Sequence, residues 1–191
     1  MRLFVAIPLP VHVIAALTDL QQRVRILMPE GDRVVRWTRT EQFHLTLRFF
    51  GNVEEEKLEA LRDRLHQAVL NFNPFDLQLG HCGCFPNSNH PRILWVGLEG
   101  DVASLNALHE SIRIQTADFG QPPDDRKFQP HLTLGRLRHS SRAQNFRKKC
   151  EAISAPVRSA SWTVNEMQLI YSRLSAEGSI YRMIAQVRFR T

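Results

Sequence analysis

The sequence predicts an α+β fold with two lobes, in which two mainly antiparallel β-sheets flanked by helices surround a central cleft with pseudo-twofold symmetry. Strand-like and helix-like apolar spacing alternates along the 191 residues. The last two strand-like segments follow each other directly, which favours antiparallel pairing. The tetrapeptide at 44–47 recurs unchanged at 131–134, so each lobe would contribute one copy. No stretch rich in Gly or Ser divides the chain, and we expect residues 1–191 to form a single bilobal domain.

The first half of the chain alternates strands with helices. Residues 2–9 form an apolar strand, and apolar side chains then recur every three or four positions through 11–28, which predicts a helix with one buried face that begins at Val11. A short strand over 33–38 precedes a clear strand over 43–50. Residues 54–70 predict a second helix, whose acidic first turn suits the positive end of the helix dipole.

The second half of the chain continues this pattern and then ends in strands. The expected elements are strands at 75–85 and 92–99, a helix at 101–119, a strand at 130–138, a short basic helix at 141–151, and a closing hairpin of strands at 161–174 and 180–189.

Composition restricts the class of protein. Hydrophobic residues make up 43% of the chain and charged residues 23%, which is ordinary for a globular protein and excludes disordered or collagen-like chains. The longest apolar stretches, at 3–9 and 93–98, are shorter than the roughly 18 residues that a membrane span needs. Met1 leads directly into a strand, so we expect no secretory leader. These features predict a cytoplasmic protein that does not bind a membrane.

Charge is distributed unevenly along the chain. Residues 1–125 carry 12 Lys and Arg against 16 Asp and Glu, whereas residues 126–191 carry 13 against 3. A basic C-terminal third indicates an anionic partner, with nucleic acid favoured over a membrane surface, although a solvated basic face would look the same. The residues that could form a track for RNA phosphates are Arg126, Lys127, Arg138, Arg142, Arg147, Lys148 and Lys149.

The three cysteines make a poor disulfide framework. Their odd number and the tight spacing of Cys82 and Cys84 indicate a reducing compartment. Together with His81 they could belong to a metal site, but a second ligand pair at zinc-like spacing is missing from the sequence. Packing as small hydrophobic residues in a strand is the interpretation that we favour.

The repeated tetrapeptide H-L-T-L carries the chemistry of the sequence. Residues i and i+2 of a strand point to the same face, so His44 and Thr46 share one face of their strand, and His131 and Thr133 share one face of theirs. Two imidazoles can act as a general base and a general acid, and two hydroxyls can donate to phosphate oxygens. Placed on opposite walls of a cleft, these groups suit in-line cleavage of a phosphodiester without a metal.

Other chemistries fit the sequence less well. A metal site would need a third ligand, which neither tetrapeptide carries. The sequence contains no G-x-S-x-G element for a nucleophilic serine and no Walker-type phosphate loop. We therefore expect no cofactor and no metal. A non-catalytic RNA-binding module with the same fold is the alternative, although such a module has no need for paired imidazoles.

The chain resembles the 2H phosphoesterases, and more closely the bacterial and archaeal RNA 2′,3′-cyclic phosphodiesterases, historically called 2′-5′ RNA ligases. The resemblance covers nearly the whole chain, through the two H-x-T-x motifs and the segments RLFVAIPLP, VRWTRTEQFHLTLRFFGNV, PRILWVGLE and FQPHLTLGR. It implies a bilobal α+β fold. It also implies metal-independent hydrolysis of a 2′,3′-cyclic phosphate RNA end to a 2′-phosphate. The same site could join such an end to a 5′-hydroxyl, because it lowers the barrier in both directions.

The resemblance also implies roles for individual residues. His44 would protonate the leaving 3′-oxygen and His131 would accept a proton from water, while Thr46 and Thr133 hold the phosphate. In related sequences the second motif extends to an arginine that contacts phosphate, and Arg136 stands at that position here. The partner implied is RNA with a 2′,3′-cyclic phosphate end, bound by a monomer.

Three further residues are candidates for substrate binding. Arg136 lies five positions after His131, so a regular strand would turn it away from the cleft unless the strand bends or bulges at Gly135. Arg48 lies four positions after its histidine and has the correct parity for a phosphate contact. Phe128 precedes the second motif and is a candidate for stacking on an RNA base, ahead of Trp37 and Phe43.

Overall fold

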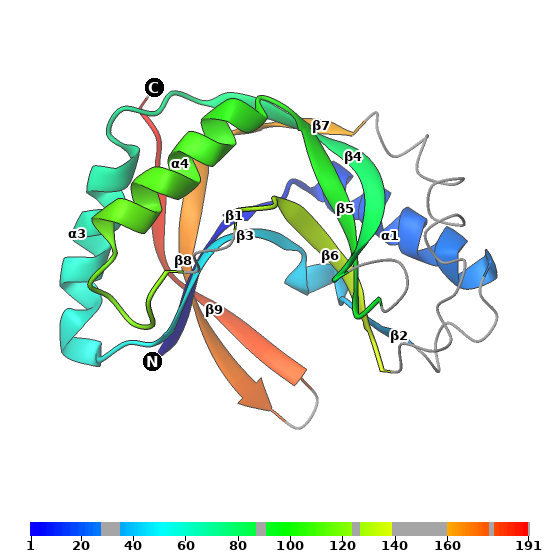
Figure 1. Cartoon of the computed structure of the whole chain (residues 1–191), viewed down its shortest axis with the longest axis horizontal. Helices are drawn as coiled ribbons and strands as arrows, with labels where there is room; N and C mark the ends of the chain where they lie inside the picture. The colour runs from blue at the N-terminus through cyan, green and yellow to red at the C-terminus, as the bar shows by residue number, and fades with distance from the viewer. Residues whose placement is uncertain (28–34, 87–90, 124–126, 139–159, 176–177, 191) are drawn as a thin grey trace.

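The computed structural model describes residues 1–27, 35–86, 91–123, 127–138, 160–175 and 178–190. These residues form two antiparallel β-sheets that lie side by side, with helices packed against them (Figure 1). All strand pairs that join described residues are antiparallel. The predicted fold class is confirmed.

The first sheet has four strands in the order β3-β1-β8-β9. They are β1 (Arg2–Pro8), β3 (His44–Asn52), β8 (Glu166–Ser175) and β9 (Gly178–Arg188). The second sheet has five strands in the order β2-β6-β5-β4-β7. They are β2 (Val35–Trp37), β4 (Phe75–Phe85), β5 (Ile93–Gly100), β6 (His131–Leu137) and β7 (Ser161–Val164). Each sheet therefore contains one of the two repeated tetrapeptides, on β3 and on β6.

Burial explains why β1 lies in the interior of its sheet. Residues 3–7 are all apolar and all buried, as expected for a strand that is covered on both faces. Most of these side chains join the main core, whereas Phe4 and Ala6 form a second small cluster with Ile170 on the opposite face. Since β3 pairs with β1 along its length, the first motif lies beside this buried strand.

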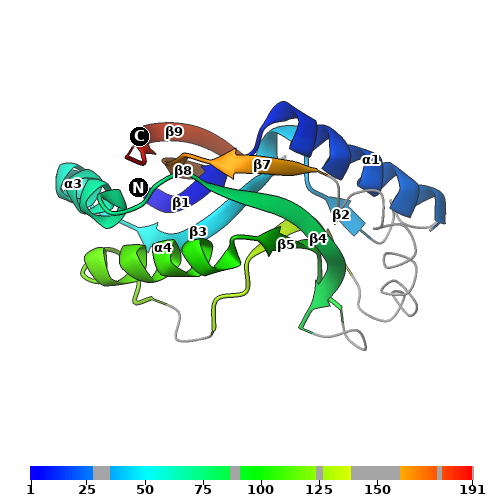
Figure 2. The same ribbon diagram turned by 90° about the horizontal axis from the view of Figure 1, so that it is seen from above.

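Two helices each follow a strand of one sheet but pack against the other sheet. Helix α1 (Val11–Leu27) follows a strand of the first sheet, yet it packs on the second, where the Gln21 side-chain amide donates to the carbonyl of Leu134 at 2.8 Å. Helix α4 (Val102–Gln115) follows a strand of the second sheet, yet it lies beside α3 (Leu58–Val69) on the first sheet (Figures 1 and 2). Neither lobe is built from one continuous half of the chain.

Four predictions about individual elements need correction. The helix expected at 101–119 ends at Gln115. The buried stripe of α1 runs through Val13, Leu17, Leu20 and Val24, whereas Val11 is 83% exposed at the first turn. The predicted helix at 54–70 begins with the separate 3₁₀ turn η2 (Glu55–Lys57) before α3. The predicted strand at 161–174 is two strands, because β7 joins the second sheet and β8 joins the first.

Some predicted features lie outside the described residues. They are the basic helix at 141–151, Cys150, and Arg126, Arg142, Arg147, Lys148 and Lys149. Lys127 and Arg138 are described, and both are exposed. Cys82 is a buried free thiol within the core, as predicted, and Cys84 is a half-buried free thiol. Across the described ranges, none of the helices combines the length and the apolar character that crossing a bilayer would require.

Candidate active site

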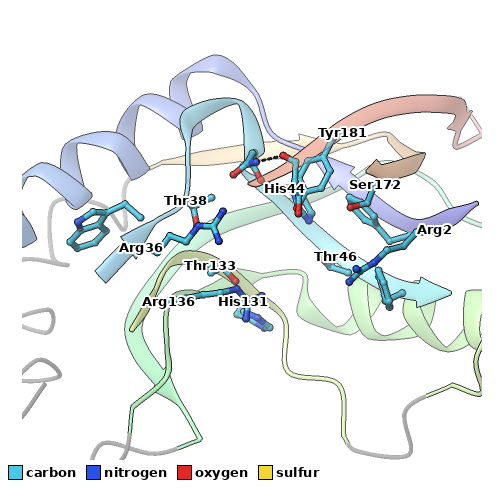
Figure 3. A pocket seen from close by; sticks show the side chains of 15 residues that line it. Arg2, Arg36, Thr38, His44, Thr46, His131, Thr133, Arg136, Ser172 and Tyr181 are labelled. Atoms are coloured by element: carbon cyan, nitrogen blue, oxygen red, sulfur yellow. Dashed lines mark hydrogen bonds between the residues drawn. The ribbon is translucent and has the colours of Figure 1, made fainter. Parts of the chain in front are cut away.

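Both repeated motifs line one cavity of about 460 Å³. Figure 3 shows His44 and Thr46 projecting from β3, with His131, Thr133 and Arg136 projecting from β6 opposite them. The predicted alternation is present in both strands, because Leu45, Leu47, Leu132 and Leu134 are buried in the core. The cavity is also lined by Arg2, Phe4, Arg36, Trp37, Thr38, Gln42, Phe49, Ser172, Ser179 and Tyr181.

The two imidazoles are held in the same way. The Nδ1 atom of His44 lies 2.7 Å from the carbonyl of Gln42, and the Nδ1 atom of His131 lies 2.8 Å from the carbonyl of Gln129. A carbonyl can only accept, so Nδ1 must carry the hydrogen in both rings. The Nε2 atom is then the position on each ring where a proton can be taken up or released.

Aromatic rings flank each imidazole. The ring of His44 lies 4.9 Å from that of Phe4 and 5.4 Å, edge-on, from that of Tyr181. The ring of His131 lies 4.9 Å, edge-on, from Phe85 and 6.4 Å from Trp95. These neighbours fix the ring planes and displace water from the histidines.

The surroundings favour the neutral form of both histidines. Burial lowers the pKa of His44, the hydrogen bond to Gln42 opposes that shift, and the nearby positive charge of His131 lowers the pKa further. Burial also lowers the pKa of His131, against the hydrogen bond to Gln129, and the positive charge of Arg136 adds to the lowering. The cavity therefore supplies two neutral imidazoles until an anion enters.

A one-residue register shift follows the threonine in both motif strands. On β3, Thr46 pairs with Ala6 and Arg48 with Val5, so Leu47 is the extra residue. On β6, Thr133 pairs with Trp95 and Gly135 with Leu94, so Leu134 is the extra residue. Such a bulge reverses the alternation of side chains beyond it. The fifth residue after each histidine therefore returns to the cavity, and the fourth does not.

A phosphate contact from Arg136 requires the strand to bend or bulge near Gly135. This bulge is present, and it brings Arg136 to the cavity. Gly135 makes the bend possible, since a Cβ atom at that position would come within 2.6 Å of Cγ1 of Val35. Arg36 pairs with Arg136 between β2 and β6 and lines the same cavity. The placement of Arg136 agrees with the expectation.

The expectation that Arg48 faces the cleft is wrong. The bulge at Leu47 turns Arg48 into the interior, where its side chain is 6% exposed. Its guanidinium donates to the hydroxyl of Thr116 and to the carbonyls of Arg113, Phe119 and Gln121. It therefore attaches β3 to the C-terminal end of α4 and has no contact with the cavity.

The aromatic candidates have separate positions. Trp37 lines the cavity, and Phe43 is buried in the core. Phe128 stacks on His109 with ring centroids 3.9 Å apart. It lines a second cavity that, among the residues that the structure describes, shares His131 alone with the first. Its role in base stacking stays a prediction.

The sequence reasoning missed several residues of the cavity. Arg2 belongs to the first strand, where alternation with Phe4 could have revealed it. Arg36 could not have been found, because nothing in the sequence shows that β2 joins β6. Arg2, Arg36 and Arg136 give the cavity three guanidinium groups, which favour an anionic ligand. Within the described ranges, no three His, Cys, Asp or Glu side chains gather as metal ligands.

The chain is similar to known proteins over most of its length. The profile of the 2′-5′ RNA ligase superfamily matches residues 36–175. Among curated proteins, the chain is 30% identical over 182 residues to an RNA 2′,3′-cyclic phosphodiesterase of Methanothermobacter thermautotrophicus, with 94% of each chain covered. It is 31% identical to a protein of the same name from Archaeoglobus fulgidus, with 95% of this chain and 97% of that one covered.

Solved structures show the same fold. A crystal structure of a Thermus thermophilus protein superposes with a TM-score of 0.79 at 29% identity, covering 100% of this chain and 98% of that one. The structure of E. coli LigT complexed with 3′-AMP gives 0.78 at 26% identity with the same coverage. With a family profile that spans most of its length and full-length relatives at 30% identity, the chain belongs to the 2′-5′ RNA ligase superfamily of 2H phosphoesterases.

Proposed function

We propose that the protein is an RNA 2′,3′-cyclic phosphodiesterase, which hydrolyses cyclic phosphate ends to 2′-phosphomonoesters within one bilobal domain over residues 1–191. The observation that carries this proposal is the pair of imidazoles, each held through Nδ1 and placed on opposite strands of one cavity that contains three arginines. The names of the curated relatives support the same activity.

The proposed mechanism uses two proton transfers. His131 takes a proton from water at Nε2 while the water oxygen bonds to phosphorus. The P–O3′ bond breaks, and His44 donates its Nε2 proton to the leaving 3′-oxygen. The product keeps its phosphate on the 2′-oxygen, and the two histidines have exchanged protonation states.

The remaining groups stabilise the charge on the phosphate. The hydroxyls of Thr46 and Thr133 lie on the same strand faces as the histidines and donate to the non-bridging oxygens. Arg136 and Arg36 add positive charge beside β6. The side chains of Phe49 and Tyr181 line the same cavity and offer aromatic surfaces for the terminal nucleoside.

Substrate charge explains how His44 becomes an acid. In the free protein its pKa is lowered by burial and by His131. A bound phosphodiester anion raises that pKa, because it stabilises the imidazolium form. Substrate binding therefore favours the protonated form of His44, which holds the proton that the leaving group needs. His131 stays neutral because Arg136 opposes its protonation.

The direct test uses an oligoribonucleotide that ends in a 2′,3′-cyclic phosphate. We expect the purified protein to release a 2′-phosphate end, resolved from a 3′-phosphate by chromatography, and to keep its activity in a chelator. Loss of activity on chelation that zinc restores would contradict the two-histidine mechanism. Tight RNA binding without turnover would identify a non-catalytic RNA-binding module.

The proposal includes the setting in which the enzyme works. We take it to be a cytoplasmic monomer that binds RNA ends and no membrane. Size-exclusion chromatography with light scattering would test the monomer, with a mass of about 22.1 kDa expected.

A further inference from the structure

One arginine of the catalytic cavity has no part in the mechanism proposed above. Arg2, at the start of β1, lines the cavity from the first sheet, whereas Arg36 and Arg136 line it from the second. Figure 3 shows Arg2 together with Ser172, on the far side of the cavity from Arg36 and Arg136. The charge of Arg2 is therefore available for a different part of the substrate.

The guanidinium of Arg2 is held in place but not neutralised. It lies over the ring of Phe49, with Cζ 4.9 Å from the ring centroid, a contact that orients the group and leaves its N–H donors available. The backbone on either side is fixed, because Leu3 pairs with β8 and the carbonyl of Met1 accepts from the amide of Val53 at 2.8 Å. Among the residues that the structure describes, no Asp or Glu lines the cavity or forms an ion pair with Arg2. Arg2 is a preorganised donor for an anion.

A buried hydroxyl lies beside this guanidinium. Leu3 pairs with Tyr171 between β1 and β8, so the next position of the same antiparallel register sets Arg2 opposite Ser172. Ser172 lines the cavity and is 5% exposed, yet its hydroxyl has no hydrogen-bond partner among the described residues. Buried hydroxyls are normally hydrogen-bonded, because burial without a partner costs free energy. An anion bound at Arg2 would accept from this hydroxyl as well.

The register of the first sheet sets this pair apart from the catalytic groups. Ala6 pairs with Thr46 and Phe4 with Phe49, so Arg2 follows in the direction that leads away from the histidine. From Thr46 to Phe49 the strand advances about 10 Å, which is the scale of one nucleotide. A substrate with its cyclic phosphate at Thr46 can therefore extend its 5′ side along β3 to the guanidinium that lies over Phe49.

We propose that Arg2 and Ser172 form a subsite for the phosphodiester on the 5′ side of the terminal nucleotide. The subsite makes the enzyme prefer the ends of oligonucleotides to mononucleotide cyclic phosphates. This inference rests on the proposed function and narrows the substrate class of the same site. The guanidinium and the hydroxyl donate to the non-bridging oxygens of that phosphodiester. No bond of this group breaks, and the subsite aligns the terminal cyclic phosphate between the two histidines.

The experiment compares three substrates that differ at this phosphate. They are adenosine 2′,3′-cyclic phosphate with a free 5′-hydroxyl, a dinucleotide that ends in the same group, and that dinucleotide with an uncharged methylphosphonate linkage. The unmodified protein should hydrolyse the charged dinucleotide with a kcat/KM about 10- to 100-fold above that of the other two, the factor expected for hydrogen bonds to a charged group. The neutral linkage tests the contact without any change to the protein, and it separates charge from stacking by the second nucleoside.

Variants then assign the contact to the two residues. Arg2→Met should lower kcat/KM for the charged dinucleotide by about tenfold or more, and for the methylphosphonate by less than about threefold, because the losses of two partners in one contact do not add. Ser172→Ala should reduce the advantage of the charged linkage by about threefold to tenfold. Arg62→Met changes an exposed arginine of α3 outside the cavity and should keep the full advantage.

The outcomes separate this inference from the proposed function. Absence of hydrolysis of all three substrates by the unmodified protein would contradict the proposed function itself. Equal kcat/KM for the charged and the neutral dinucleotide would overturn only the subsite. An equal loss with both linkages in folded Arg2→Met would show that the guanidinium acts on the cyclic phosphate, which also overturns it. Competition by inorganic phosphate that Arg2→Met abolishes, without any preference for the charged linkage, would assign the pair to a free anion instead.

Discussion

The two motif strands, β3 and β6, begin alike and end differently. Both carry H-L-T-L, both hold Nδ1 of the histidine at a glutamine carbonyl two residues earlier, and both contain an extra residue after the threonine. Beyond that point, β3 continues with Arg48 and Phe49, whereas β6 continues with Gly135 and Arg136. The fourth position after the histidine is buried on both strands, and the fifth lines the cavity.

Because of this difference, the two walls of the cavity present different side chains. The first strand buries its arginine and presents the ring of Phe49, over which the guanidinium of Arg2 lies at 4.9 Å. The second strand packs a glycine and presents Arg136. The same backbone geometry therefore places an aromatic ring at this position on one wall of the cavity and a guanidinium group on the other.

Removing either imidazole should have the largest effect on catalysis. His44→Ala and His131→Ala should each lower kcat for a 2′,3′-cyclic phosphate dinucleotide by about 10³-fold or more, because general acid and general base catalysis each contribute 10²–10⁴-fold. His66→Ala changes an exposed histidine of α3 and should keep full activity. Turnover retained in both cavity variants would refute their assignment.

The arginines that follow the two motifs should behave differently. Arg136→Met removes charge from the cavity and should lower kcat/KM by about 10²-fold with little change in Tm, since a charge-assisted hydrogen bond is worth roughly 1.5–3 kcal/mol. Arg62→Met, at an exposed site of α3 outside the cavity, is the matched control.

Arg48→Met should instead lower the stability of the fold. The variant leaves the hydroxyl of Thr116 and several carbonyls without their buried donor, at a cost on the order of 3 kcal/mol in the free energy of unfolding. Chemical denaturation measures this loss. A stable Arg48→Met protein with reduced kcat would mean that the guanidinium acts at the substrate after all.

The threonines should give smaller and similar effects. Thr46→Ala and Thr133→Ala each remove one hydroxyl from the phosphate site and should lower kcat/KM about tenfold. Thr46→Ser and Thr133→Ser keep the hydroxyl and should recover most of the activity. Equal losses in the alanine and serine variants would indicate packing by the methyl group rather than hydrogen bonding.

The pH dependence of kcat/KM gives the smallest and most specific test. Activity falls on the acid side when His131 gains a proton and on the alkaline side when His44 loses one. Both pKa values are lowered from the ordinary value of about 6.5, so the maximum should lie on the acid side of neutrality.

Arg136→Met sharpens that test because it acts on one limb of the profile. Removing the positive charge raises the pKa of His131, and the acid limb should therefore move to higher pH. Arg62→Met should leave both limbs in place. A profile without any inflection in the histidine range would contradict acid–base roles for both rings.

Local patterns made most of the fold predictable. Apolar periodicity placed β1, β3 and α1 within one or two residues of their observed bounds. The break between β7 and β8 was missed, although the apolar alternation changes phase between Val164 and Met167 at that point. Attention to that phase change could have separated the two strands.

The four central residues of the site were predictable because they repeat, whereas its other members depend on tertiary structure. The alternating Leu45 and Leu47 give no sign that β3 contains an extra residue at Leu47. Simple alternation of side chains along the strand therefore predicted, wrongly, that Arg48 faces the cleft. For the second strand, the small size of Gly135 did signal the bend. Arg36 enters the cavity only because β2 pairs with β6, a long-range contact that no local pattern contains.

Because α1 and α4 each pack against the sheet of the other lobe, neither lobe is complete without the other. A hydrogen bond from Gln21, in the first half of the sequence, holds the backbone at the bulge of β6. A hydrogen bond from Arg48 attaches β3 to the end of α4, which comes from the second half. A fragment that contained either motif alone would lose the brace on its own histidine strand, so we expect severed halves to regain the catalytic geometry only by reassociating.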